Sequence, residues 1–216
     1  MRYTHIIWDF NGTVISDMQT GIDSVNIMLE ERGLPVVGGV EEYREIFDFP
    51  VKEYYRRLGF DFSAEPYDEL AHKWVLLYKE NSCKITPSLH VREVLEKIRQ
   101  TEIVQHILSA SEQRMLEYQL EHFGLKNFFE KIYGLSDIYA EGKIELTHIW
   151  LKDNPGAVPL FVGDTVHDAD TARALGCDCI LYSGGHQSRK RLEKCGVPVV
   201  DSLKDVLCYL DTKFLF

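Results

Sequence analysis

The sequence predicts an α/β protein: a doubly wound parallel sheet with a small α-helical domain inserted after its first strand. Three observations predict this fold. The chain opens with a short apolar run, Ile6–Trp8, that is typical of a buried strand. From about residue 83 onward, short apolar runs alternate with single helical patterns, as in a sheet covered on both faces. Between these two parts, residues 16–82 contain only helical patterns. We therefore expect a core domain of residues 1–15 and 83–216 and a cap domain of residues 16–82.

Size and composition exclude several classes of protein. The chain has 216 residues, of which 45% are hydrophobic and 27% charged, as in ordinary globular proteins. Its net charge of −10 disfavours nucleic-acid binding, and we interpret the basic run 189–191 as a solvated helix face. No apolar run is long enough to span a membrane, so we expect a cytoplasmic protein. The five cysteines form no metal-binding spacing, and we expect reduced thiols with packing roles.

The helical insertion and the alternating core can be divided into elements. In the insertion, apolar spacing predicts helices over residues 17–33, 40–47, 51–58 and 66–80. In the core, it predicts strands over residues 103–108, 131–135, 158–162, 179–182 and 197–200. Helices are expected over residues 87–100, 111–123, 143–151, 166–175, 188–195 and 203–210.

Polar side chains of particular types stand at the predicted strand ends and beside them. Asp9 ends the first strand, Ser109 ends the second, Lys143 precedes a helix, and Asp164 is followed by Asp168. Because parallel strands end along one edge of a sheet, these residues can meet although they are far apart in sequence. Their chemistry fits transfer of a phosphoryl group through an aspartyl phosphate, with Asp9 as the nucleophile.

The other residues supply what such an attack requires. Asp9, Asp164 and Asp168 are hard oxygen donors suited to Mg²⁺. Lys143 would neutralise negative charge, while the Ser109 hydroxyl and loop amides after the first strand would hold phosphoryl oxygens.

Each residue also has a structural interpretation when it is taken alone. Ser109 could cap a helix with Glu112 three residues on, Lys143 could lie on the surface, and Asp168 could favour the start of its helix. A receiver-type signalling domain also combines a phosphorylated Asp with Mg²⁺, Ser/Thr and Lys. In that family the acidic pair lies near the first strand, whereas here it comes last, and the chain is too long.

Four segments resemble the four motifs of the haloacid dehalogenase superfamily, most of whose members are Mg²⁺-dependent phosphatases. The segments are Trp8-Asp9-Phe10-Asn11-Gly12-Thr13, Ile107-Leu108-Ser109, Gly142-Lys143, and Val162-Gly163-Asp164-Thr165-Val166-His167-Asp168. The cap type and size resemble those of the phosphoglycolate-phosphatase-like branch.

The resemblance implies a fold, a site and a substrate class. It implies a sheet ordered 5-4-1-2-3 by strand number, with the strand near Val197 added beyond the fifth. It also implies that Gly12 and Thr13 help to bind phosphate and that the Asn11 carbonyl completes the metal shell. The expected partner is a small phosphorylated substrate bound by a monomer or weak homodimer, with no nucleic acid and no membrane.

The sequence departs from the family at Asn11, where the phosphatases carry a second Asp that acts as general acid and base. An amide can do neither, so turnover is expected to be impaired. Three accounts remain open. Another group such as His167 could replace the acid, although a helix-surface position for it is the simpler interpretation. The protein could instead bind a phosphorylated ligand or partner without turnover. The Asn11-Gly12 bond could also deamidate to Asp.

Substrate choice is expected to reside in the cap, which would close over the strand ends. Arg44 is a candidate there for clamping a substrate carboxylate or second phosphate. The simpler interpretation is a solvated helix arginine. The sequence fixes no particular substrate.

Overall fold

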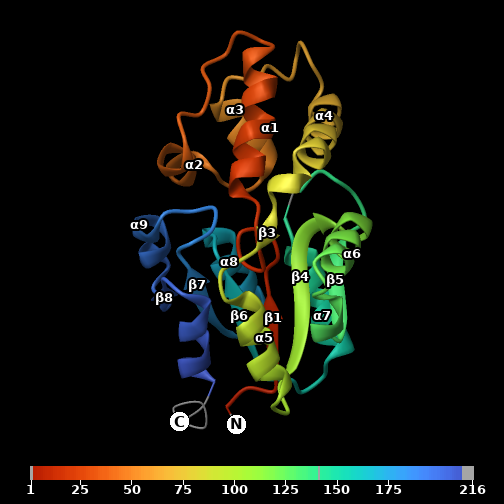
Figure 1. Ribbon diagram of the computed structural model, residues 1–216, viewed down its shortest axis with the longest axis vertical. Coiled ribbons are helices and arrows are strands. Elements are labelled where there is room, and N and C mark those ends of the chain that lie inside the picture. The colour runs from red at the N-terminus through yellow and green to blue at the C-terminus, as the bar shows by residue number, and fades with distance from the viewer. Residues whose placement is uncertain (1, 141, 211–216) are drawn as a thin grey trace.

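The protein consists of an α/β core with a helical cap above the carboxyl edge of its sheet (Figure 1). The structure is a computed structural model and describes residues 2–140 and 142–210. Six parallel strands form the sheet in the order β5-β4-β1-β6-β7-β8. Their bounds are β1 His5–Trp8, β4 Val104–Glu112, β5 Lys131–Leu135, β6 Pro159–Gly163, β7 Asp178–Tyr182 and β8 Val199–Val200. This order is the one implied by the family resemblance, with β8 as the added strand.

The central strand β1 places Asp9, the residue that follows it, in the middle of the sheet. Trp8 pairs with Ile107 of β4 on one side and with Val162 of β6 on the other. Trp8, Ile107 and Val162 therefore lie side by side at the same level of the sheet. Asp9, the segment after Ile107 and the segment after Val162 all emerge at one point, as ligand sites do in open α/β sheets.

Alternation along β1 divides the core into two layers. Ile6 and Trp8 face a cluster that contains the helices α5 and α6 and the 3₁₀ segment η4, whereas Ile7 faces a cluster that contains α7, α8 and α9. Both faces of the sheet are thus covered, because side chains of successive strand residues point to opposite faces. The bounds are α5 Val91–Arg99, α6 Gln113–His122, η2 Lys126–Phe128, α7 Ile144–Asp153, α8 Val166–Leu175, α9 Arg189–Leu192, η3 Glu193–Cys195 and η4 Leu203–Tyr209.

The cap has its own apolar core, built by four helices, and the short η1 follows them. Val25, Met28, Tyr54, Tyr55 and Leu70 are buried there together. The bounds are α1 Met18–Glu30, α2 Val40–Ile46, α3 Val51–Arg57, α4 Tyr67–Glu80 and η1 Ser82–Lys84. All four predicted cap helices are confirmed, each with slightly shorter bounds.

Two short strands that the sequence did not predict join the cap to the core. β2 (Ile15–Ser16) leads into the cap and β3 (Thr86–Pro87) leads out of it, and the two pair antiparallel. Each has only two residues, too few to show an apolar alternation. The exact division into domains at residues 15/16 and 82/83 stays a prediction, and residues 1, 141 and 211–216 of the predicted core lie outside the described residues.

Several element boundaries differ from the predictions. β4 continues to Glu112, so the predicted helix at Ser111 begins only at Gln113. The predicted helix at Pro87 begins at Val91, because residues 86–87 pair with β2 instead. The predicted closing helix is wrong in type: η4 is a 3₁₀ segment.

Two surface interpretations also need correction. Cys83 and Cys208 are exposed, so packing does not account for them, whereas Cys179 is buried as expected. Arg191 is not a solvated helix residue: it donates hydrogen bonds to main-chain carbonyls of residues 44, 45 and 47 and pairs with Asp48 at 3.1 Å.

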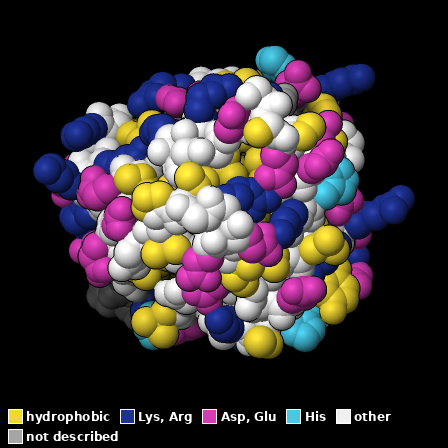
Figure 2. Space-filling model, turned by 90° about the horizontal axis from the view of Figure 1, so that it is seen from above, with side chains coloured by type: hydrophobic (Ala, Val, Ile, Leu, Met, Phe, Trp, Pro, Cys, Tyr) yellow, Lys and Arg dark blue, Asp and Glu magenta, His cyan; other side chains and the backbone are white. Residues whose placement is uncertain are grey.

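The surface at the cap end carries mixed charge. Seen from above, Lys and Arg side chains are interspersed with Asp and Glu side chains (Figure 2). Within the described residues, no helix combines the length and apolar character that a membrane span requires. The absence of nucleic-acid and membrane partners stays a prediction.

Candidate active site

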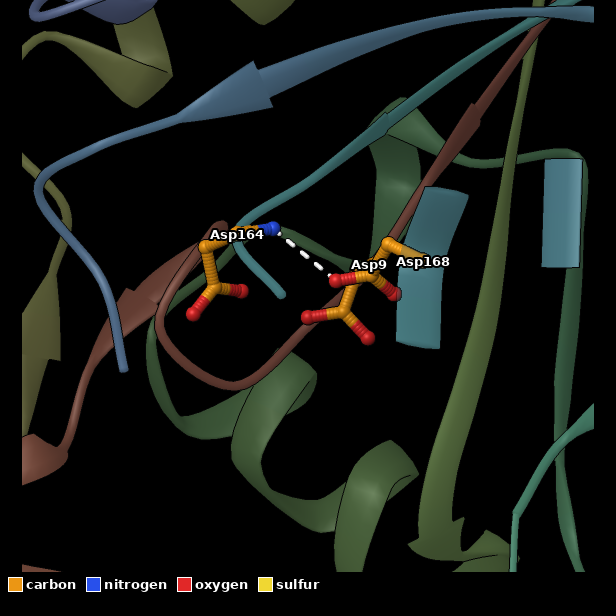
Figure 3. Close-up of side chains that lie close together, drawn as sticks. All are labelled: Asp9, Asp164 and Asp168. Carbon is orange, nitrogen blue, oxygen red and sulfur yellow. Dashed lines mark hydrogen bonds between the residues drawn. The ribbon is translucent and has the colours of Figure 1, made fainter. Parts of the chain in front are cut away.

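Three aspartates meet at the carboxyl edge of the sheet. Asp9 directly follows β1, Asp164 follows β6, and Asp168 lies in the first turn of α8. One carboxylate oxygen from each lies within 4.8 Å of the others, and all three residues are buried (Figure 3). Asp9 is fixed by its own main chain, because its N–H donates to the carbonyl of Val162 at 2.8 Å.

Helix α8 holds Asp168 rigidly. Its Oδ2 accepts hydrogen bonds from the amides of Asp164 (2.9 Å) and Thr165 (2.8 Å) and from the Thr165 hydroxyl (2.7 Å). With Thr165 as the N-cap residue, this is a capping box. Asp168 therefore caps its helix through Oδ2, as its structural interpretation predicts, and its Oδ1 remains turned toward Lys143.

Lys143 is the cation of this cluster and is only 1% exposed. Its ammonium contacts the Asp9 carboxylate and lies 2.6 Å from Asp168 Oδ1. It also donates to the Leu108 carbonyl at 3.3 Å. Lys143 therefore does not lie on the surface, which was the alternative interpretation of this residue taken alone; its catalytic role stays a prediction. We call Asp9, Lys143, Asp164 and Asp168 the acidic floor.

The floor contains more negative than positive charge. Burial raises the pKa of Asp9 well above its ordinary value, with Lys143 opposing the shift and the other two carboxylates adding to it. Burial likewise raises the pKa of Asp164 to about 6. Burial acts in the same direction on Asp168, but the adjacent Lys143 outweighs it and lowers that pKa. One ammonium therefore does not compensate three buried carboxylates.

Asn11 is hydrogen-bonded to residues near both ends of the cap. Its amide nitrogen donates to Asp17 at 2.7 Å and to the Tyr78 hydroxyl at 3.3 Å, and its amide oxygen accepts from the Ser111 hydroxyl at 2.6 Å. Asp17 is the N-cap residue of α1, and Tyr78 lies near the end of α4. The Asn11 side chain thus has its hydrogen-bonding groups engaged in a position facing the cap.

His186 and Asp17 form a buried pair next to Asn11. The sequence alone did not predict this pair. His186 Nε2 lies 3.2 Å from Asp17 Oδ1, and its Nδ1 lies 2.8 Å from the Tyr43 hydroxyl of the cap. Burial disfavours the imidazolium, yet Asp17 outweighs it and raises the pKa of His186 to about 9. The pKa of Asp17 is lowered against its own burial, chiefly by His186.

One sequence signal could have pointed to His186. It follows Gly184-Gly185, and a Cβ at Gly185 would overlap the Asp164 carboxylate. The missing side chain lets this loop approach the floor closely enough for the His186 amide to donate to Asp164 at 2.6 Å.

The predicted phosphate-binding residues divide into two groups. Ser109 is buried beside the floor, and its hydroxyl accepts from the Ser111 amide at 3.1 Å. The Gly12 amide donates to Asp17 at 3.0 Å, while the Thr13 amide donates to the carbonyl of residue 10 and its hydroxyl donates to Asp164. Gly12 and Thr13 therefore stabilise the loop and the floor here, and their role in phosphate binding stays a prediction.

Arg44 was considered as a substrate clamp and His167 as a replacement general acid, and both side chains are engaged elsewhere. Arg44 donates to the carbonyls of Gly184 and Gly185, both at 2.9 Å, and joins cap to core. His167 Nε2 accepts the Lys143 main-chain N–H at 3.2 Å, and its ring stacks on Phe49 at 4.8 Å. His167 is thus packed between core and cap, and the surface interpretation is wrong.

A cavity of about 130 Å³ lies between floor and cap. Its lower part is lined by Asp9, Asn11, Ser109 and Asp168, among others. Its upper part is lined by a set of cap side chains that we call the aromatic roof: Phe47, Phe49, Tyr54, Tyr55 and Trp74.

Comparison with known proteins gives the class of the chain. Residues 6–182 match the family of haloacid dehalogenase-like hydrolases, so the chain belongs to it. It is 25% identical to a phosphoglycolate phosphatase of Pseudomonas savastanoi, over 94% of this chain and 78% of that protein. It is also 25% identical to the tyrosine-protein kinase PtkA of Mycobacterium tuberculosis, over 94% and 72%.

The fold is shared with solved structures of low sequence identity. A haloacid dehalogenase-like hydrolase of Streptococcus pneumoniae superposes with a TM-score of 0.84 at 19% identity, covering 97% of this chain and 99% of that one. Membership of the family, predicted from the four motifs, is confirmed.

Proposed function

We propose that the protein is a Mg²⁺-dependent phosphatase that hydrolyses a small phosphorylated metabolite through an aspartyl phosphate on Asp9. The observation that carries the proposal is the contact of the buried Asp9 carboxylate with Lys143, beside Asp164 and Asp168. The phosphoglycolate phosphatases among its relatives support the same reaction class.

The charges around the floor fit a divalent cation. Including Asp17, four buried carboxylates face two cationic side chains, Lys143 and His186. Two negative charges are left in excess, which matches one Mg²⁺. Carboxylate oxygens are the ligands this ion prefers. Asp9, Asp164 and Asp168 would hold it, together with the Asn11 carbonyl, and it would neutralise charge on the substrate phosphoryl group.

The residues of the chain would act in two steps. In the first, an Asp9 carboxylate oxygen forms a bond to phosphorus while the ester bond breaks and its electron pair leaves with the substrate oxygen. In the second, water attacks phosphorus and the Asp9–phosphorus bond breaks, which restores the carboxylate. Lys143 would stabilise the charge on Asp9 and the transferring group, and Ser109 would donate a hydrogen bond to a phosphoryl oxygen.

Asn11 limits both steps, because it can neither protonate the leaving oxygen nor accept a proton from water. Loss of such acid–base help typically costs about 10²–10⁴-fold in rate. We therefore expect phosphorylation of Asp9 to persist for good leaving groups, and hydrolysis of the phosphoenzyme to be slow.

The test is a phosphatase panel with Mg²⁺ on the wild-type protein and on Asn11→Asp. Wild-type protein mixed with acetyl phosphate should show a burst of product followed by a slow steady state. Acid quenching should trap a phosphoryl group on the peptide containing Asp9. Wild-type turnover of alkyl phosphates as fast as that of Asn11→Asp would contradict the role given to Asn11.

A second candidate function is binding of a phosphorylated ligand or partner without turnover. The observation that favours it is the engagement of the Asn11 amide by Asp17 and Ser111. Activity in neither protein of the panel, combined with phosphate protection against thermal unfolding, would favour this candidate. Deamidation at Asn11 is tested separately, by peptide mass analysis for a species one dalton heavier; its absence would remove that account.

A further inference from the structure

The cavity between floor and roof determines what can be attached to the phosphoryl group. Asp9, Ser109 and Asp168 line the same cavity as Tyr54 and Trp74 of the cap. A phosphoryl group placed for attack by Asp9 therefore directs its substituent toward the roof. The volume of about 130 Å³ must hold the phosphoryl group as well, so only a small substituent fits beneath the roof.

The roof presents aromatic rings in a fixed arrangement. Phe47 meets Tyr54 at 5.2 Å and 71°, and meets Phe49 at 5.5 Å and 77°, both edge to face. Trp74 stacks on Tyr78 at 4.7 Å. Rings held in this way offer faces and edges to a further ring without reorganising.

The described lining offers no cation to a negatively charged substituent. It includes neither lysine nor arginine, and it includes the carboxylates of Asp17 and Glu112. The ring of His186 also lines it, but both ring nitrogens are engaged, by Asp17 and by Tyr43. Arg44 is held by main-chain carbonyls of the core. A carboxylate in this cavity would be buried without a partner, which is strongly unfavourable.

The absence of a general acid at Asn11 independently favours a substrate with an aromatic leaving group. Without a proton donor at Asn11, the leaving oxygen departs as an anion. A phenol has a pKa of about 10, similar to that of a tyrosine side chain. An alkyl alcohol ionises only at a pKa near that of bulk water, about 16. A phenolate therefore departs far more readily than an alkoxide.

Resting on the phosphatase function proposed above, we propose that the substrate is a small phosphate monoester of an uncharged aromatic alcohol. Asp9 forms its bond to phosphorus, the bond between phosphorus and the aryl oxygen breaks, and the electron pair leaves with the phenolate. The phenolate takes a proton from water after release. Water then hydrolyses the aspartyl phosphate to inorganic phosphate. Phosphoglycolate, whose carboxylate would lie under the aromatic roof, is a poor substrate.

The test compares four compounds with wild-type protein and Mg²⁺. Phenyl phosphate should exceed phosphoglycolate in kcat/KM by about 100-fold or more, as expected for an unpaired buried charge. It should exceed 4-carboxyphenyl phosphate by about 10-fold or more. The comparison of phenyl with 4-carboxyphenyl phosphate measures the effect of the cavity, because 4-carboxyphenol is the more acidic phenol and the better leaving group. Acetyl phosphate reports the chemistry without an aromatic group.

The outcomes separate this inference from the function on which it rests. Hydrolysis of acetyl phosphate with phosphoglycolate equal to or better than phenyl phosphate overturns the aromatic substrate and leaves the phosphatase intact. Equal rates for phenyl and 4-carboxyphenyl phosphate overturn it as well. Hydrolysis of none of the four overturns both proposals.

A filled cavity provides a second test. Gly21 of α1 lines the cavity, and the nearest atom that its Cβ would meet is the Tyr43 hydroxyl at 3.9 Å. Gly21→Leu should therefore occupy the cavity and lower the rate ratio of phenyl to acetyl phosphate about 10-fold or more. Gln19→Leu, on the exposed side of the same helix, is the matched control and should keep the wild-type ratio.

Ala71→Leu on α4 offers an independent filling variant if Gly21→Leu does not fold, as judged by thermal melting. Ala71 is buried and lines the same cavity. An unchanged ratio in a folded filling variant would show that the substituent does not lie under the roof, and would overturn the proposal.

Discussion

The acidic floor and the aromatic roof line one cavity but are built in opposite ways. The floor is held by strand ends and by hydrogen bonds and ion pairs between charged groups, as at Asp9, Lys143 and Asp168. The roof belongs to α3, α4 and the segment between α2 and α3, and is held by ring packing, as between Phe47 and Tyr54. Under the two proposals above, the floor would carry out the reaction and the roof would select the leaving group.

Removal of the nucleophile should have the largest effect on the floor. Asp9→Asn should lower turnover of every substrate by about 10³-fold or more, because the bond to phosphorus cannot form. It should remain folded, since Asp168 still pairs with Lys143. The measurement is phosphate release from acetyl phosphate, with Asp178→Asn, an exposed partner of Arg2, as the control. Full activity in Asp9→Asn would refute the aspartyl phosphate.

Moving the carboxyl group from residue 17 to residue 11 tests whether Asn11 limits turnover because it is not an acid. Asn11→Asp alone would place a carboxylate against that of Asp17, whereas the double variant Asn11→Asp/Asp17→Asn preserves an amide–carboxylate contact. We expect the double variant to speed turnover of an alkyl phosphate by about 10²-fold and the single variant by less. Steady-state rates on phosphoglycolate and phenyl phosphate provide the measurement. A larger gain in the single variant would contradict the coupling to Asp17.

The pH dependence of activity can be interpreted only where the fold is stable, and His106 in β4 limits that range. Its ring is fully buried and its Nδ1 accepts from Trp150 Nε1 at 2.9 Å. Burial lowers its pKa to about 4. Between pH 4 and 6.5 the unfolded state binds more protons at this residue. Stability is therefore complete above pH 6.5 and falls by about 3 kcal/mol as the pH drops to 4.

The measurement is the free energy of unfolding in denaturant at several pH values, for the wild-type protein and for His106→Gln. The glutamine can still accept the Trp150 hydrogen bond but does not titrate. The slope between pH 4 and 6.5 should be shallower in the variant. Equal slopes would show that other groups account for the loss of stability in acid.

The smallest effect is expected in the cap. Gly21→Ala should stabilise α1 by up to about 1 kcal/mol, because alanine is the better helix former and its Cβ has room. Gly33→Ala is the matched control: its Cβ also has room, but φ is +64° there, so this variant should destabilise. Thermal melting compares them. A lower melting temperature for Gly21→Ala would show that the cavity wall does not tolerate a methyl group at this position.

The sequence was sufficient for the fold class and for the floor because both depend on regular features. Apolar runs and glycine stops mark the strands, and polar residues such as Asp9 and Asp164 stand directly at their ends. The same reasoning could not find His186, since its pairing with Asp17 depends on how a loop folds back between domains. Nor could it find the aromatic roof, because Phe47 and Tyr54 read equally well as ordinary core residues.

The pairing of β2 with β3 would allow the cap to be replaced during evolution. The chain enters the cap through Ile15–Ser16 and returns through Thr86–Pro87, and the two strands lie side by side. Paired strands are about 4.8 Å apart, so any insert whose ends lie equally close could take the place of the cap without moving the sheet. Substrate preference could thus be exchanged as a module, while the carboxylates at the sheet edge are inherited unaltered.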